Sequence, residues 1–278
     1  MKIVLSIRRF QPEGVGAGDG AGGGAIREDS GLGFQAFEVD AEPASRLLDA
    51  LIFVQRRVDP TLSFRRSCGH GVCGSDAMLI NGREGLACKT LVRDVADKDG
   101  AVVTIEPLRS LDAVRDLVVD EGEFFKRYRA VKPYLIEGRD AKGGAPATAT
   151  AGTANGTAGG MTEERERRQS PAEREVIDDA TNCILCAACY SACPVVRDIN
   201  RKFIGPAAVV QAFRFIGDSR DHGFEERHGV LNDPNGVWPC ENKFECTRVC
   251  PRGIKVTKLI NATKRRLSGA HADVMGRK

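Results

Sequence analysis

The stretch CILCAACYSACP occupies residues 183–194 and spaces four cysteines as C-x2-C-x2-C-x3-C before a proline. Two-residue gaps form a tight loop in which three thiolates converge on one face of a [4Fe–4S] cube, while the fourth cysteine serves a neighbouring cluster. Structural zinc is the alternative interpretation, but C-x2-C-x2-C-x3-C-P is not the usual two-plus-two spacing of zinc ligands. The stretch therefore predicts a segment built around iron–sulfur clusters.

A second stretch, CENKFECTRVCP at residues 240–251, repeats this pattern with one cysteine missing. Cys240, Cys246 and Cys250 stand at the first, third and fourth places, and Lys243 stands at the second. An ammonium group has no lone pair, so Lys243 cannot replace the missing thiolate. Three thiolates suit a [3Fe–4S] cluster, because its vacant corner needs no ligand.

In two-cluster ferredoxins, the proline-linked cysteine of each run ligates the cluster of the other run. Applying this exchange divides the seven cysteines into two predicted ligand sets. The [4Fe–4S] set is Cys183, Cys186, Cys189 and Cys250, and the [3Fe–4S] set is Cys193, Cys240 and Cys246.

Another group of cysteines lies in RRSCGHGVCGSDAMLINGREGLACKT, residues 65–90. Plant-type [2Fe–2S] sites space their ligands as C-x4-C-x2-C, with a fourth cysteine further on. The third place holds Asp76 here, and a carboxylate oxygen is a sound ligand for ferric iron. The predicted ligands are therefore Cys68, Cys73, Asp76 and Cys88. Alternatively, Asp76 caps the loop, and Ser75 or water is the ligand.

Small residues surround these ligands. Gly69, Gly71 and Gly74 allow backbone amides to turn toward the sulfur atoms and donate hydrogen bonds, which raises the reduction potential. We interpret His70, in the same loop, as a surface residue rather than a ligand.

The composition limits the class of protein. The chain has 278 residues, 42% of them hydrophobic, which is enough for two packed domains. Its net charge of +3 comes from 41 basic and 38 acidic residues, so nucleic-acid binding is not expected. The amino-terminal MKIVLSIRRF is too short for a signal-peptide core, and no apolar run approaches the ~18 residues of a membrane span. We expect a soluble, cytoplasmic chain whose ten clustered cysteines bind metal.

Strand composition marks residues 2–10 and 34–39, and short strands flank the cysteines of residues 65–90. The glycine-rich loop between the first two strands contains GDGAGG (18–23), a literal G-x-G-x-x-G. A second strand follows it where the dinucleotide motif needs a helix, so we interpret the loop as a flexible hairpin insert.

Helical patterns cover residues 43–57, residues 111–134 and most of the chain from 176 onward. Residues 141–160 have the composition of a linker, and the charge run 163–175 that of a solvated helix face. The predicted domains are 1–136, binding [2Fe–2S]; a linker, 137–172; and 173–270, binding the other clusters. Residues 271–278 form a tail.

The three predicted sites in this order resemble the iron–sulfur subunits of succinate dehydrogenases and fumarate reductases. The resemblance extends to SFRRSC, VCGSDAM, KFIGPA, RFIGDSRD and VCPRGI. An aspartate in place of the third cysteine, as at Asp76, is a known variation in that family. It implies an α+β fold: a plant-ferredoxin-like β-grasp domain followed by an all-helical bacterial-ferredoxin-like domain.

The resemblance also implies a function. The chain would relay electrons between the FAD of a flavoprotein subunit, which interconverts succinate and fumarate, and a quinone-reactive membrane anchor. It would lie peripherally at the cytoplasmic face of the inner membrane, with no catalytic residue of its own. The [2Fe–2S] cluster would lie nearest the flavin and the [3Fe–4S] cluster nearest the quinone.

One region departs from the ubiquinone-linked members of the family. Asp198 and Glu241 stand where those members have a tryptophan and a histidine near the quinone, and Lys243 replaces an apolar residue. Charges at these places favour an anchor that is a cytochrome b with two b haems and reacts with menaquinone. Lys243 is either merely solvated or favours the reduced [3Fe–4S] state.

Two other functions stay open from the sequence. The chain could serve a different flavoprotein complex, although KFIGPA and DSRD favour the succinate dehydrogenase and fumarate reductase function. It could also be a zinc-stabilised interaction module, which would lack the visible absorption of iron–sulfur clusters.

Overall fold

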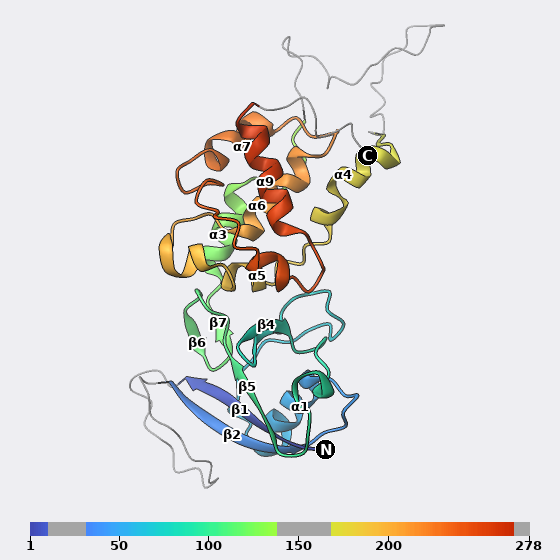
Figure 1. The fold of residues 1–278 in the computed structure, drawn as a ribbon, viewed down its shortest axis with the longest axis vertical. Coiled ribbons are helices and arrows are strands. Elements are labelled where there is room, and N and C mark those ends of the chain that lie inside the picture. Colours follow the sequence, from blue (N-terminus) through green and yellow to red (C-terminus); the bar gives the residue numbers. More distant parts are fainter. Residues whose placement is uncertain (11–31, 138–167, 270–278) are drawn as a thin grey trace, which may run out of the picture.

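The computed structural model describes residues 1–10, 32–137 and 168–269. A β-sheet half and a helical half lie end to end along the long axis of the molecule (Figure 1). The GDGAGG motif, the 141–160 linker, the 271–278 tail and the first part of the charge run lie outside the described residues. The α+β fold class predicted from the sequence is confirmed, and the domain bounds stay a prediction.

The amino-terminal half is built on a five-stranded sheet of order β2-β1-β5-β3-β4. Its strands are β1 (Lys2–Phe10), β2 (Leu32–Asp40), β3 (Ala77–Ile80), β4 (Arg83–Leu86) and β5 (Ala101–Glu106). Strands β1 and β5 pair in parallel, and the other neighbours pair antiparallel. Alternate residues of β1 (Ile3, Leu5 and Ile7) are fully buried, as the two-residue period of a strand requires.

One helix packs against this sheet. Helix α1 (Leu47–Phe53) continues into a π-helical turn, Val54–Val58, so the helix predicted over 43–57 begins later than expected. Its Leu47 and Leu51 share one apolar cluster with the inward residues of β1. A short helix, α2 (Val92–Val95), precedes β5.

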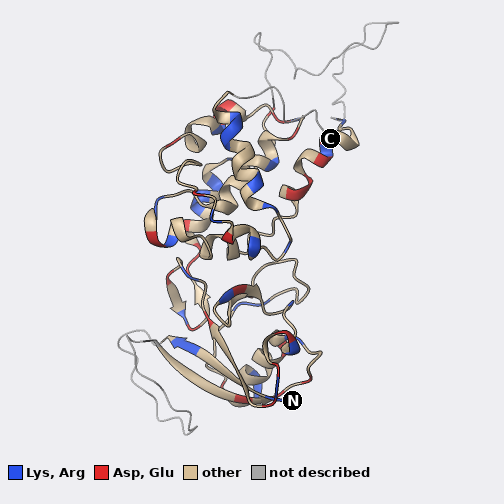
Figure 2. Ribbon diagram, viewed as in Figure 1, with Lys and Arg blue, Asp and Glu red and all other residues tan. Residues whose placement is uncertain are grey.

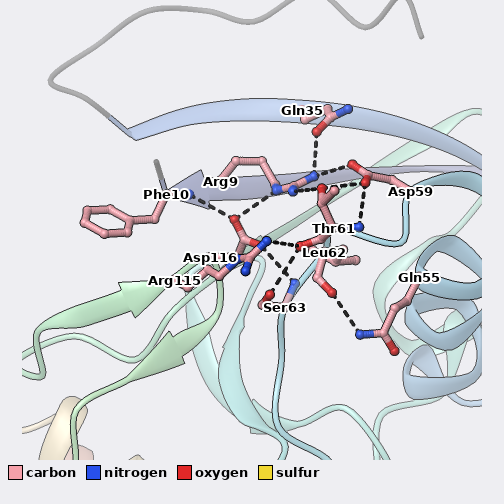
Figure 3. A network of polar contacts seen from close by, with 10 residues as sticks. All are labelled: Arg9, Phe10, Gln35, Gln55, Asp59, Thr61, Leu62, Ser63, Arg115 and Asp116. Carbon is pink, nitrogen blue, oxygen red and sulfur yellow. Dashed lines mark hydrogen bonds and ion pairs between the residues drawn. The ribbon is translucent and has the colours of Figure 1, made fainter. Parts of the chain in front are cut away.

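The helix predicted over 111–134 is wrong for its first half. Residues Ala113–Arg115 (β6) and Val118–Val119 (β7) form a hairpin, and only Gly122–Ala130 (α3) is helical. Asp116, in the hairpin turn, has φ of 47° and is buried. Its carboxylate accepts hydrogen bonds from Arg9 Nε and from the backbone N–H groups of Phe10 and Ser63 (Figure 3). These contacts from distant segments override the local helical pattern.

The helical half is organised around α6 (Pro206–Ile216), nearly all of whose residues are buried. Helices α3, α4 (Pro171–Thr181), α7 (Phe224–Leu231) and α9 (Val256–Leu267) pack against it. Two four-residue helices, α5 (Ala188–Ser191) and α8 (Glu245–Arg248), follow the cysteine loops, and a π-helical turn covers Val195–Ile199. No helix among the described residues is long and apolar enough to cross a membrane.

Candidate functional site

The loop before β3 brings its predicted ligands together. The backbone N–H of Cys73 donates to Cys68 Sγ over 3.4 Å, and that of His70 does so over 3.3 Å. These amides lower the pKa of the Cys68 thiol to about 6, so a thiolate is favoured there. The Ser75 hydroxyl lies 3.1 Å from Cys73 Sγ. The His70 side chain is exposed, as predicted.

Asp76 lies beneath this loop and is almost fully buried. Its Oδ2 accepts a hydrogen bond from the Cys88 N–H over 2.5 Å, whereas its Oδ1 is buried with no hydrogen-bond partner among the described residues. Burial and the adjacent carboxylate raise the pKa of the Cys88 thiol to about 12. A buried oxygen without a donor carries a desolvation cost, which a metal ion beside it would remove. The donor set therefore fits a [2Fe–2S] cluster.

Gly74 brings this loop against the next cysteine loop. It has φ of 73°, and a Cβ placed there would lie 2.7 Å from Cys186 Cβ and 3.0 Å from Cys186 Cα. Only glycine permits that approach. The first and second cysteine groups, more than a hundred positions apart in the sequence, are therefore in direct backbone contact.

The second cysteine group lines a cavity in the helical half. Cys183, Cys186, Cys189 and Cys250 border it together with the apolar Ile184, Leu185, Ala207 and Val210. Burial raises the pKa of the Cys186 thiol to about 12, and it raises that of Cys189 well above the usual value. Cys250 borders the same cavity and lies close enough to Cys183, Cys186 and Cys189 to affect their ionisation. These residues fit the donor set of a [4Fe–4S] cluster.

The third group lines a separate cavity. Cys193, Cys240 and Cys246 border it, together with Pro194, Lys243, Phe244 and Thr257. Burial raises the pKa of the Cys246 thiol to about 11, and Cys193 and Cys240 add to this effect. Cys189 lies in α5 and Cys246 in α8, and these two helices contact each other, so the two cavities are neighbours. Three thiols and no fourth cysteine in the lining fit the donor set of a [3Fe–4S] cluster.

The two loops of the helical half share one backbone conformation. Leu185 and Ala187 have φ of 56° and 59° on either side of Cys186, and Asn242 and Phe244 have φ of 56° and 63° on either side of Lys243. In each loop a four-residue helix follows the second left-handed residue. Lys243 therefore occupies the backbone position that Cys186 has in the other loop.

The surface near the third cavity is charged. Lys243 Nζ lies 3.3 Å from Glu241 Oε2, and both side chains are about half exposed. Asp198 is exposed, and its hydrogen bonds to Arg197 lower the pKa of its carboxyl. Acidic and basic residues are interspersed over both halves of the molecule (Figure 2).

Two polar contacts to the cysteines were missed from the sequence. Gln211 lies in α6, is buried, and its side chain partly offsets the effect of burial on the pKa of the Cys183 thiol. A lone glutamine inside the apolar run PAAVVQAF was a usable signal, because buried polar side chains need a partner. Thr257 lies 3.5 Å from Cys246 Sγ, and no motif marks it. Among the described residues, no three His, Cys, Asp or Glu side chains converge as tightly as a single bound metal ion requires.

Two family models match the chain. One describes a 2Fe-2S iron-sulfur cluster binding domain and matches residues 5–126, and the other describes a 4Fe-4S dicluster domain and matches residues 179–254. These ranges contain the cysteine groups of the corresponding halves.

Relatives align over nearly the whole chain. The succinate dehydrogenase iron-sulfur subunit of Coxiella burnetii is 36% identical over 93% of this chain and 94% of its own length. The fumarate reductase iron-sulfur subunit of Mycobacterium tuberculosis is 35% identical over 91% of this chain and 87% of its own. A chain of the Mycobacterium smegmatis Sdh1 complex in the apo form superposes with a TM-score of 0.71 at 25% identity, with 98% of both chains covered. The chain therefore belongs to the family of iron–sulfur subunits of succinate dehydrogenases and fumarate reductases, which are oxidoreductases.

Proposed function

We propose that this chain relays electrons between the FAD of a flavoprotein subunit and a membrane-anchor subunit that exchanges them with quinone. The observation that carries the proposal is the adjacency of the three cysteine groups. Gly74 touches Cys186 between the first and second groups. Helix α5, which contains Cys189, contacts α8, which contains Cys246, between the second and third. Groups placed in series suit stepwise electron transfer from one end of the molecule to the other.

The ligand sets predicted from the sequence are part of the proposal. Iron–sulfur clusters bound there would each accept and release one electron at a time. The chain's residues would hold the ligands in place, surround the second and third groups with partly buried apolar side chains and donate backbone hydrogen bonds to sulfur. Asp76 Oδ1 would complete the [2Fe–2S] ligand set, and the Lys243 position would leave one corner of the third cluster without a ligand.

The anchor type follows from the charged surface near the third cavity. Asp198, Glu241 and Lys243 are exposed there, and three charges do not form an apolar quinone pocket. This supports a cytochrome b anchor with haem b that reacts with menaquinone within the membrane subunit. The chain would then be peripheral, on the cytoplasmic face of the inner membrane.

The test is metal content and spectroscopy on the purified complex. Ten cysteines and Asp76 provide eleven ligands, which divide as four, four and three. We expect about nine iron atoms per chain, the sum for one cluster of each type, and cluster signals that succinate reduces. Zinc at one ion per chain, or about twelve iron atoms, would contradict the assignment. Reduction by another flavoprotein's substrate, but not by succinate, would favour a different partner complex.

A further inference from the structure

Thr257, near the start of α9, contacts a cysteine of the third cavity. Its Oγ1 lies 3.5 Å from Cys246 Sγ and 3.0 Å from Thr247 Oγ1. Its backbone N–H donates to Thr247 Oγ1 over 3.0 Å. Thr257 is only 2% exposed and Cys246 only 7%, so little water competes for these hydrogen bonds.

The direction of this hydrogen-bond chain follows from its donors. A cysteine bound to iron is a thiolate and can only accept a hydrogen bond. The Thr257 hydroxyl therefore donates its single proton to Cys246 Sγ, and its oxygen accepts from the Thr247 hydroxyl. The Thr247 oxygen in turn accepts from the Thr257 N–H. Each proton is used once, the chain ends on sulfur, and the bonds polarise one another in a low-dielectric interior.

We propose that Thr257, positioned by Thr247, raises the reduction potential of the cluster held by Cys193, Cys240 and Cys246. This inference rests on the proposed function. An added electron increases the negative charge on the sulfur ligands, and a donor aimed at sulfur stabilises that more negative state.

The two cysteine loops of the helical half have matching backbones, but the threonine hydroxyl that supports the donor to Cys246 Sγ has no equivalent after Cys189. The counterpart of Thr247, one place after the corresponding cysteine, is Tyr190. The Tyr190 hydroxyl accepts a hydrogen bond from Arg127 instead. The Thr247–Thr257 pair thus gives the α8 cysteine of the third site a hydroxyl donor that the matching Cys189 does not receive from Tyr190, and this favours electron transfer toward the anchor.

The experiment is a redox titration of the purified complex. The low-temperature paramagnetic signal of the oxidised [3Fe–4S] cluster reports the redox state at each potential. Thr257→Val removes the donor at nearly constant volume, and Thr257→Ser keeps it. The control is Thr263→Val, because Thr263 is equally buried on α9 but donates to the Leu259 carbonyl over 3.0 Å. We expect Thr257→Val to lower the midpoint by about 59 mV, a tenfold fall in the reduced-to-oxidised ratio for one electron. Thr257→Ser and Thr263→Val should stay near wild type.

Thr247→Val supplies an independent test, because it leaves the Thr257 hydroxyl in place but removes its polarising donor. A smaller shift of the same sign is expected. Equal midpoints in Thr257→Val and Thr263→Val would overturn the inference. If Thr257→Val lost the cluster, an unchanged midpoint in Thr247→Val would overturn it. A wild-type complex without the oxidised three-iron signal would refute the proposed function itself.

Discussion

At the scale of single residues, the two carboxylate oxygens of Asp76 have different environments, which suit loop capping and iron ligation respectively. Oδ2 is satisfied by the Cys88 N–H and holds the loop, whereas Oδ1 is buried and has no donor among the described residues. The sequence predicted a ligand at this place but left loop capping open. The geometry is compatible with both roles at once, so substitution must separate them.

Asp76→Asn keeps an acceptor for the Cys88 N–H but replaces the charged oxygen with an amide. If Asp76 is a ligand, Asp76→Asn should lose or weaken the [2Fe–2S] cluster, and Asp76→Cys should retain it with a thiolate in place of the carboxylate. Visible absorption and the reduced-state paramagnetic signal measure the cluster. A wild-type spectrum and potential in Asp76→Asn would show that the residue only caps the loop.

Lys243 is predicted to mark the missing ligand, and the backbone gives that prediction a geometric basis. Its flanking residues have the same left-handed conformation as those of Cys186, and its side chain borders the third cavity. Lys243→Cys should therefore allow a fourth iron to bind and abolish the oxidised three-iron signal.

The matched variant is Lys243→Met, which removes the charge without adding a ligand and should keep the signal. Because Lys243 is half exposed and paired with Glu241, its removal should shift the potential little. Persistence of the three-iron signal in Lys243→Cys would mean that position 243 does not face the vacant corner.

At the scale of elements, the sequence predicted what depends on local pattern and missed what depends on distant contacts. The strand composition of residues 2–10 predicted β1, and cysteine spacing predicted both cysteine loops. The β6–β7 hairpin could not be predicted, because Asp116 is held in its turn by Arg9, Phe10 and Ser63 from other segments. Thr257 was missed for the same reason, since only folding brings it to Cys246.

A buried ion pair attaches the segment after α3 to the helical half. Arg227 is fully buried, pairs with Asp221 at 2.7 Å and donates to the carbonyls of Val131, Lys132 and Tyr134. Arg227→Met should reduce the free energy of unfolding by about 3–5 kcal/mol, because it leaves Asp221 buried without its counter-charge. Thermal or denaturant unfolding of the complex measures the change.

The control for Arg227 is the exposed pair of Lys126 and Glu123, 3.1 Å apart on α3. Lys126→Met should cause little measurable change, since water screens that pair. Equal destabilisation by both substitutions would show that the buried pair has no special role in holding the segment.

At the scale of the whole molecule, the two halves differ in what stabilises them. The sheet half has a continuous apolar core that includes Ile3, Leu5, Val103 and Ile105. The helical half contains the four-residue helices α5 and α8, far below the ~12–15 residues that an isolated helix needs. Each of its proposed clusters joins cysteines from both loops, so iron would add cross-links to the apolar packing that holds Tyr190, Val195 and Val256 in one core.

Removing iron from the complex with a chelator should therefore increase backbone opening more in the helical half than in the sheet half. We expect backbone amide exchange to accelerate most in residues 183–199 and 240–256, and least in β1 and β5. Burial raises the pKa of thiols such as Cys186, so the emptied cavities would contain neutral thiols that cannot replace the lost metal bonds. Hydrogen–deuterium exchange with mass spectrometry, before and after iron removal, measures this. Strands β1 and β5 serve as the internal reference, since they contain no predicted ligand. A uniform rise across both halves would mean that the molecule unfolds as one unit, and unchanged exchange in α5 and α8 would mean that their packing against α6 and α9 suffices without iron.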